Sequence, residues 1–188
     1  MDKELEIGVS LLRAFKRADL YEAERIISEN NIDIRKVTES DKWSWLHKVL
    51  LGFEPDVPPK KTVEYLIQQG LDVNAQDRYG MTPLHYAMRS KNVAAATALL
   101  EAGADPNIPN IENVTPLACI GGMPEQLGLL KLMLDKGGDV NYFNGQHGLL
   151  EGLKKYGSDI PHFPEVIALM EKYDKTVQIN STNNESEP

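Results

Sequence analysis

The stretch that decides the fold is Asp77-Arg78-Tyr79-Gly80-Met81-Thr82-Pro83-Leu84-His85-Tyr86-Ala87. Its first four residues have turn composition, with a glycine that tolerates positive φ. Thr82 can cap a helix through its hydroxyl, and Pro83 suits the first helical position because its missing N–H has no partner there. Leu84 and Ala87 are three residues apart, so both face one side of that helix. The stretch therefore predicts a turn that leads directly into a short amphipathic helix.

A second helix is predicted over residues 92–100, followed by Glu101-Ala102-Gly103-Ala104-Asp105-Pro106-Asn107. Gly103 is placed to end that helix as a left-handed C-cap. Such a helix pair cannot bury its apolar face alone, so similar pairs must stack on both sides of it. The whole unit, residues 77–109, resembles an ankyrin repeat, a unit of about 33 residues whose first helix opens with Thr-Pro-Leu-His-x-Ala.

The same pattern recurs along the chain in weaker form. Ser44-Trp45-Leu46-His47 aligns with Thr82 to His85, and Thr115-Pro116-Leu117 opens a further unit in which Ala118 replaces the histidine. The resemblance implies an all-α ankyrin-repeat solenoid of about five helix-turn-helix repeats, with degenerate terminal repeats as caps. The expected repeats span about residues 1–37, 38–76, 77–109, 110–143 and 144–175. The polar segment 176–188 is expected to be a disordered tail.

Leucines at matching repeat positions predict the core, and one repeat carries an insertion. His47 and Gly70 are 23 residues apart, whereas His85 and Gly103 are 18 apart, so the second repeat holds five extra residues. They are assigned to the loop 52–59, whose three prolines exclude a helix. The predicted core residues are Leu46, Leu66, Leu84, Leu99, Leu100, Leu117, Leu130 and Leu134.

Charge, apolar runs and cysteine content limit the partners and the location that we expect for this protein. A formal net charge of −8 argues against a nucleic-acid or anionic-membrane partner and is compatible with a basic protein partner, although acidic proteins also simply stay soluble. No apolar run is long enough to span a membrane, and the acidic N-terminus lacks a signal-peptide pattern. A single cysteine, Cys119, fits a reducing compartment. Cytoplasmic residence is the expected location.

No pattern of residues predicts chemistry. The sequence has no phosphate-binding loop, paired-cysteine motif or Gly-x-Ser-x-Gly, and its histidines lack metal-ligand spacing, so no catalytic residue, metal or cofactor is expected. His85 stands at the structural histidine position of the repeat, and Cys119 is expected to be a small buried side chain. An enzyme site in the irregular last repeat would have to use scattered residues, namely Tyr156, Asp159, His162 and Glu165.

The resemblance implies a non-enzymatic module that binds a protein partner along a concave surface built from turn tips and first helices. The residues at variable positions of that surface that we predict to bind the partner are Trp43, Arg78, Tyr79, Met81, Arg89, Glu112 and Val114. Ser40, Asp41, Ser90, Ile111, Gly122 and Met123 occupy further variable positions. Trp43 could equally pack one repeat on the next, and Trp45 is expected to pack.

The junction Asp72 to Ala87 is similar to small bacterial ankyrin proteins, some of which resemble immunity proteins of contact-dependent inhibition and polymorphic toxin systems. That resemblance implies a chain that binds and neutralises a cognate toxin domain, and a basic nuclease domain would suit its negative charge. The alternative is a general ankyrin scaffold or regulatory subunit that binds a housekeeping protein.

Overall fold

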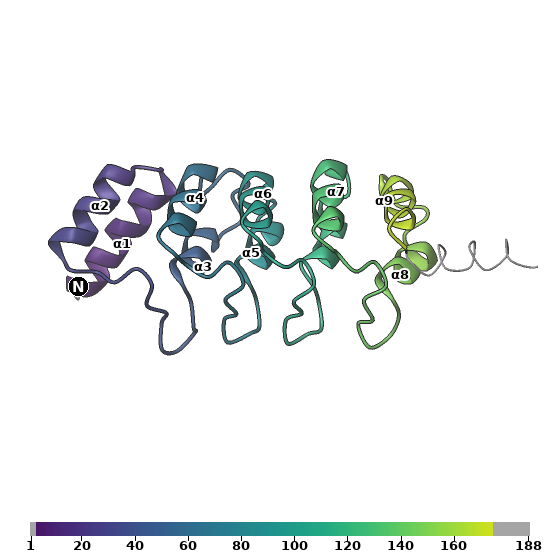
Figure 1. Cartoon of the computed structure of the whole chain (residues 1–188), viewed down its shortest axis with the longest axis horizontal. Coiled ribbons are helices and arrows are strands. Elements are labelled where there is room, and N and C mark those ends of the chain that lie inside the picture. Colours follow the sequence, from purple (N-terminus) through teal and green to yellow (C-terminus); the bar gives the residue numbers. More distant parts are fainter. Residues whose placement is uncertain (1–2, 175–188) are drawn as a thin grey trace, which may run out of the picture.

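The computed structural model describes residues 3–174, and the expected tail at 176–188 lies outside the described residues. Within that range the helices form five successive pairs, which are stacked side by side in a row (Figure 1). The pairs are α1 (Lys3–Lys16) with α2 (Leu20–Glu29), α3 (Trp45–Leu50) with α4 (Lys60–Gln68), α5 (Pro83–Arg89) with α6 (Val93–Glu101), the 3₁₀ helix η1 (Leu117–Gly122) with α7 (Leu127–Asp135), and α8 (Leu149–Tyr156) with α9 (Phe163–Glu171).

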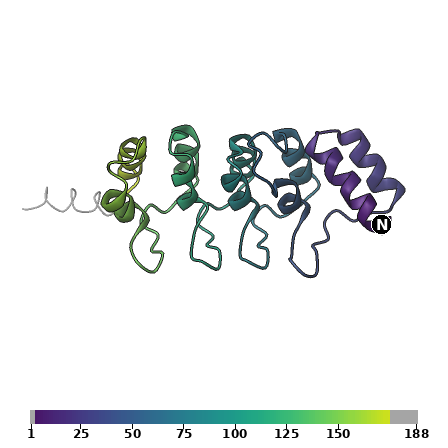
Figure 2. The same cartoon turned by 180° about the vertical axis from the view of Figure 1, so that it is seen from behind.

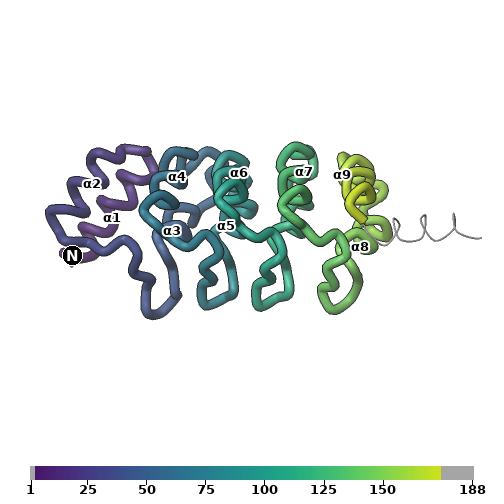
Figure 3. Tube along the Cα trace, viewed as in Figure 1, coloured from purple at the N-terminus to yellow at the C-terminus, as the bar shows by residue number. Residues whose placement is uncertain are grey.

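The pairs stack in two layers. First helices contact one another in the order α1, α3, α5 and η1, and second helices contact one another in the order α4, α6, α7 and α9. The segments that join successive pairs project to one side of the row as narrow loops, which the tube view also shows (Figure 3). Seen from behind, these loops still lie along one edge, so they form a single row of turn tips (Figure 2). No strand is present in residues 3–174, where Phe143 and Gly148 form only an isolated bridge. The all-α solenoid predicted from the sequence is confirmed.

Helix ends follow the residues that predicted them. Thr82 accepts a hydrogen bond from the N–H of His85 at 3.4 Å, and Pro83 begins α5. Gly103, directly after α6 and Ala102, has a φ of +95°. The first helix of the fourth repeat is instead the 3₁₀ helix η1, which ends at Gly122. Gly121 and Gly122 favour this early end because glycine lowers helix stability.

One hydrophobic core runs through all five pairs. All eight leucines predicted from matching repeat positions are buried, and none is more than 3% exposed. Trp45 packs as expected, because it is 6% exposed and meets the ring of Phe15 edge-on at 5.5 Å. The loop 52–59 lies between α3 and α4 without a helix of its own, as its prolines predicted.

Asparagine side chains join successive repeats beside the core. Asn74 accepts from the N–H of Asp105 at 2.8 Å and donates to the carbonyl of Gly103 at 3.2 Å. Asn107 repeats both bonds one unit later, at 2.7 Å from the N–H of Asp139 and 2.9 Å from the carbonyl of Gly137. These bonds satisfy backbone groups at helix ends and fix the spacing of the units, and so hold the turn tips in line.

Candidate functional site: a groove across the first helices

Side chains from three successive repeats surround one hollow on the first-helix side, near the turn tips. This hollow, which we call the aromatic hollow, encloses about 380 Å³. Five of the seven predicted binding residues line it: Trp43, Tyr79, Met81, Arg89 and Glu112. Leu51, Tyr86, Asn110 and Ile111 complete the lining. Five of the predicted positions from adjacent repeats therefore meet around one concavity.

Two predicted residues lie outside the lining. Arg78 lies at the rim, where its guanidinium carbon is 4.9 Å from the ring centre of Tyr79 and its Nη1 is 3.3 Å from a carboxylate oxygen of Asp41. Val114 is half-buried, and its carbonyl oxygen accepts a hydrogen bond from His85. Ser90 and Met123 are 2% and 1% exposed. Placing these last two residues on the surface was wrong, because both face the core next to the end of their helix.

Three lining residues were not among the positions predicted from the sequence, and each comes from a different part of a repeat. Tyr86 is the variable residue between the histidine and alanine of the repeat signature, so its position on a first helix could have identified it. Leu51 follows the last residue of α3, at the start of the insertion that obscured the alignment of the second repeat. Asn110 occupies the turn position that Asp77 occupies one repeat earlier, since each accepts from the N–H groups two and four residues later.

A second hollow adjoins the first. It lies between α1 and α3 and shares Trp43 and Leu51 with the aromatic hollow. Leu5 and Val9 of α1, which are 56% and 37% exposed, supply part of its apolar wall. We refer to the two hollows together as the groove. Clustered exposed apolar side chains in a concavity are typical of a protein-binding surface.

Asp77 fixes the wall of the aromatic hollow. Its buried carboxylate accepts hydrogen bonds from the Tyr86 hydroxyl at 2.6 Å, from the Trp43 indole N–H at 3.2 Å and from two backbone N–H groups. Burial acts to raise the pKa of Asp77, but these donors outweigh it, so the pKa lies below its usual value. Burial, followed by the bond to Asp77, raises the pKa of Tyr86 to about 12. Trp43 is therefore both a packing residue between repeats and part of the groove.

Two histidines tie the turn tips to the helices. Nδ1 of His47 accepts from the backbone N–H of Ser44 at 3.1 Å, and its Nε2 donates to the Met81 carbonyl, also at 3.1 Å. His85 makes the equivalent bonds, from the N–H of Thr82 at 3.0 Å and to the carbonyl of Val114 at 3.0 Å. Both rings are fully buried and hold structure across a repeat junction, which is the role that the motif predicted for His85.

These histidines predict acid sensitivity. Burial lowers the pKa of both rings, so below about pH 6.5 the unfolded chain binds more protons than the folded chain. The contribution of these rings to stability is therefore lost progressively as the pH falls below about 7, toward the lowered pKa values of the folded chain. In urea unfolding measured at a series of pH values across this range, the urea concentration at the midpoint should fall as the pH falls. The fall should be smaller for His85→Gln, which lacks one of the two rings. A constant midpoint would mean that the rings titrate alike in both states.

The candidate chemical groups named from the sequence are not brought together in the described residues. No group of three or more His, Cys, Asp or Glu side chains in residues 3–174 is arranged to hold a metal ion. Burial raises the pKa of the Cys119 thiol to about 11, so the thiol stays neutral near pH 7. In the last repeat the four candidate residues, Tyr156, Asp159, His162 and Glu165, are all exposed, and no hydrogen bond joins any two of them.

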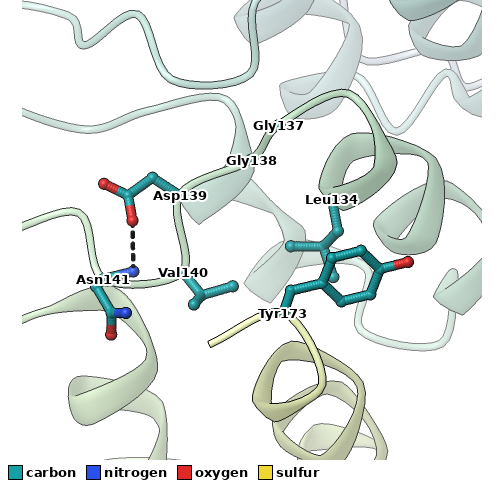
Figure 4. Close-up of a pocket in the computed structure, with 7 residues that line it drawn as sticks. All are labelled: Leu134, Gly137, Gly138, Asp139, Val140, Asn141 and Tyr173. Carbon is teal, nitrogen blue, oxygen red and sulfur yellow. Dashed lines mark hydrogen bonds between the residues drawn. The ribbon is translucent and has the colours of Figure 1, made fainter. Parts of the chain in front are cut away.

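A further hollow lies near the C-terminal end of the row. Figure 4 shows a hollow lined by Leu134, Gly137, Gly138, Asp139, Val140, Asn141 and Tyr173, at the junction of the last two repeats. Its dashed bond, from the N–H of Asn141 to Asp139 at 2.9 Å, belongs to a turn. At Gly138 a Cβ would lie 2.9 Å from the carbonyl oxygen of Met133, so this glycine serves close backbone packing. None of the helices in residues 3–174 has the length and apolar character needed to cross a bilayer.

Comparison with known proteins agrees with this architecture. Residues 11–110 match the family model for ankyrin repeats in three copies. An ankyrin repeat protein of Rickettsia bellii is 34% identical over 119 residues, which cover 54% of this chain and 34% of that protein. One from Rickettsia felis is 33% identical over 105 residues (52% of this chain, 46% of that protein), and one from fowlpox virus is 30% identical over 115 residues (61% and 16%).

The chain thus spans between about a sixth and a half of the length of these relatives. Ankyrin repeats generally mediate protein–protein interaction. The matched residues contain the turn, helix and asparagine positions from which the solenoid is built, and they include most of the aromatic hollow. On these grounds the chain belongs to the ankyrin-repeat family.

Proposed function

We propose that the chain binds a partner protein through the groove and performs no chemistry itself. The observation that carries this proposal is the aromatic hollow, where exposed side chains from three repeats meet on a wall held by Asp77. Such preorganised aromatic and arginine side chains are typical of the residues that dominate binding energy. A stable complex would bury about 1,600 Å² in total, which requires contacts beyond this one hollow.

We further propose that the partner is a toxin domain that this chain neutralises. The net charge of −8 supports a basic partner such as a nuclease, because long-range attraction would speed association. The aromatic hollow itself carries both Arg89 and Glu112, so this attraction would come from the whole surface. If the partner is a housekeeping protein instead, the chain is an ankyrin scaffold, and the gene context separates the two by the presence or absence of an adjacent toxin gene.

Tyr79→Ala should weaken partner binding without unfolding the chain. Tyr79 lines the aromatic hollow and is 45% exposed, so its removal takes away contact area and little packing. As one of the few side chains placed to anchor a partner, it should contribute more than about 1 kcal/mol, or about fivefold in Kd. The test is co-expression of the chain with toxin domains encoded beside it, read as growth rescue, together with circular dichroism of each variant.

Tyr21→Ala is the matched control, because Tyr21 is 80% exposed on α2 and lines neither hollow. Rescue by the wild-type and Tyr21→Ala chains, but not by Tyr79→Ala, would support both the groove and the toxin partner. Failure of the wild-type chain against every neighbouring toxin would refute the toxin partner. Equal rescue by all three chains would refute the groove.

A further inference from the structure

Arg89 has no carboxylate partner within residues 3–174, unlike three of the other arginines. Arg25, Arg35 and Arg78 each lie within ion-pair distance of a carboxylate. Arg89 is exposed at the last position of α5, and its guanidinium forms no ion pair or hydrogen bond with any residue in 3–174. A guanidinium carries five N–H donors in a planar fork, so the hollow contains an unused set of donors.

Two aromatic rings hold this guanidinium. Its central carbon lies 4.9 Å from the ring centre of Tyr86 and 5.6 Å from that of Phe53, both within the range of cation–π attraction. Tyr86 is fixed in turn by its bond to Asp77. A guanidinium in contact with aromatic rings can still use its N–H donors to bind a ligand, since no protein acceptor in residues 3–174 engages them.

The insertion in the second repeat supplies one of the two rings. Phe53 lies in the loop 52–59, and this side chain is 77% exposed. The far end of the loop is anchored, because the carbonyl of Pro58 accepts from the buried Asn92 side chain at 2.9 Å. The extra residues thus bring an aromatic side chain over the end of α5 and onto Arg89, which gives this insertion a role in the groove.

The surroundings of Arg89 favour a partly apolar ligand. Leu51, Met81 and Ile111 line the same hollow, and Ile111 is 71% exposed. Glu112 is the one carboxylate in the lining, and no ion pair joins it to Arg89. Apolar walls strengthen a charge-assisted bond by excluding water from it.

From these observations we infer that Arg89 binds an aspartate or glutamate carboxylate of the protein partner, with an apolar partner side chain next to it against Leu51 and Ile111. This inference rests on the proposed function, since it names the chemistry of the segment that enters the aromatic hollow. It is compatible with an overall basic partner, because one acidic side chain suffices. Glu112 would weaken such binding by repulsion across the hollow.

The probe is a phage-displayed library of random linear peptides selected on the full chain, followed by titration of the synthetic peptide that is most enriched. We expect an acidic residue beside an apolar residue in the selected sequences. Arg89→Gln should weaken binding by about tenfold to a hundredfold, the range for a charge-assisted hydrogen bond. Replacing the peptide acid by its amide should have little further effect in that variant, whereas Glu112→Gln should tighten binding.

Arg17→Gln is the charge-matched control, because Arg17 is exposed directly after α1 and lines neither hollow. Equal losses in Arg89→Gln and Arg17→Gln would reduce the effect to net charge and overturn the inference. Binding that Tyr79→Ala weakens and Arg89→Gln does not would overturn the carboxylate contact and leave the groove standing. No enriched peptide, or binding that neither variant alters, would overturn the groove as well.

Discussion

Leu84→Ala should lower the free energy of unfolding by about 2–5 kcal/mol, the range for removing a buried leucine side chain and leaving a cavity. Leu84 is 0% exposed on α5, which packs against α3 on one side and η1 on the other. In a repeat protein each unit is stabilised by its interfaces with its neighbours, so a cavity at the centre of the row weakens two of them.

Urea unfolding monitored by circular dichroism measures this loss. Leu5→Ala serves as the control, because Leu5 is 56% exposed on α1, and a surface substitution of this kind usually changes stability by no more than about 0.5 kcal/mol. Equal midpoints for Leu84→Ala and the wild-type chain would contradict the central position of α5 in the core.

The fold could be predicted from the sequence because the residues that start and end each helix are close together in the chain. Thr82, Pro83 and Leu84 specify a capped helix start within three residues, and Gly103 specifies an end. Recurrence of this unit then implies the stack, since a single helix pair leaves its apolar face uncovered. The early end of η1 follows from the glycines there, but the sequence alone did not predict that this segment would be a 3₁₀ helix.

The groove could be predicted from the sequence only in part. Repeat alignment assigned Tyr79, Met81 and Glu112 to turn positions at a fixed distance from the signature, and all three line the aromatic hollow. Alignment could not place Phe53, since an insertion has no equivalent residue in the neighbouring repeats. It also put Ser90 and Met123 on the surface, where small shifts at a helix end decide which side chain faces the core.

Asp77→Ala should be among the most destabilising single changes outside the apolar core. It would leave the buried Tyr86 hydroxyl and the Trp43 indole N–H without their acceptor, together with two backbone N–H groups of the turn. A buried polar group left unsatisfied costs about 1–3 kcal/mol, and two or more such groups make a total of about 3–5 kcal/mol reasonable. The measurement is again urea unfolding, with tryptophan fluorescence as a second probe at the affected junction.

The chain contains its own control for the turn. Asn110 occupies the equivalent position one repeat later, and its amide oxygen accepts from the N–H groups of Glu112 and Val114 as Asp77 accepts from those of Tyr79 and Met81. Asp77→Asn should therefore keep the turn and lose mainly the bonds to Tyr86 and Trp43. If Asp77→Asn is much more stable than Asp77→Ala, the side-chain oxygen at position 77 stabilises the protein chiefly by accepting the backbone bonds of the turn. If Asp77→Asn instead resembles Asp77→Ala and adds little to Tyr86→Phe, the carboxylate–tyrosine bond holds the wall of the aromatic hollow.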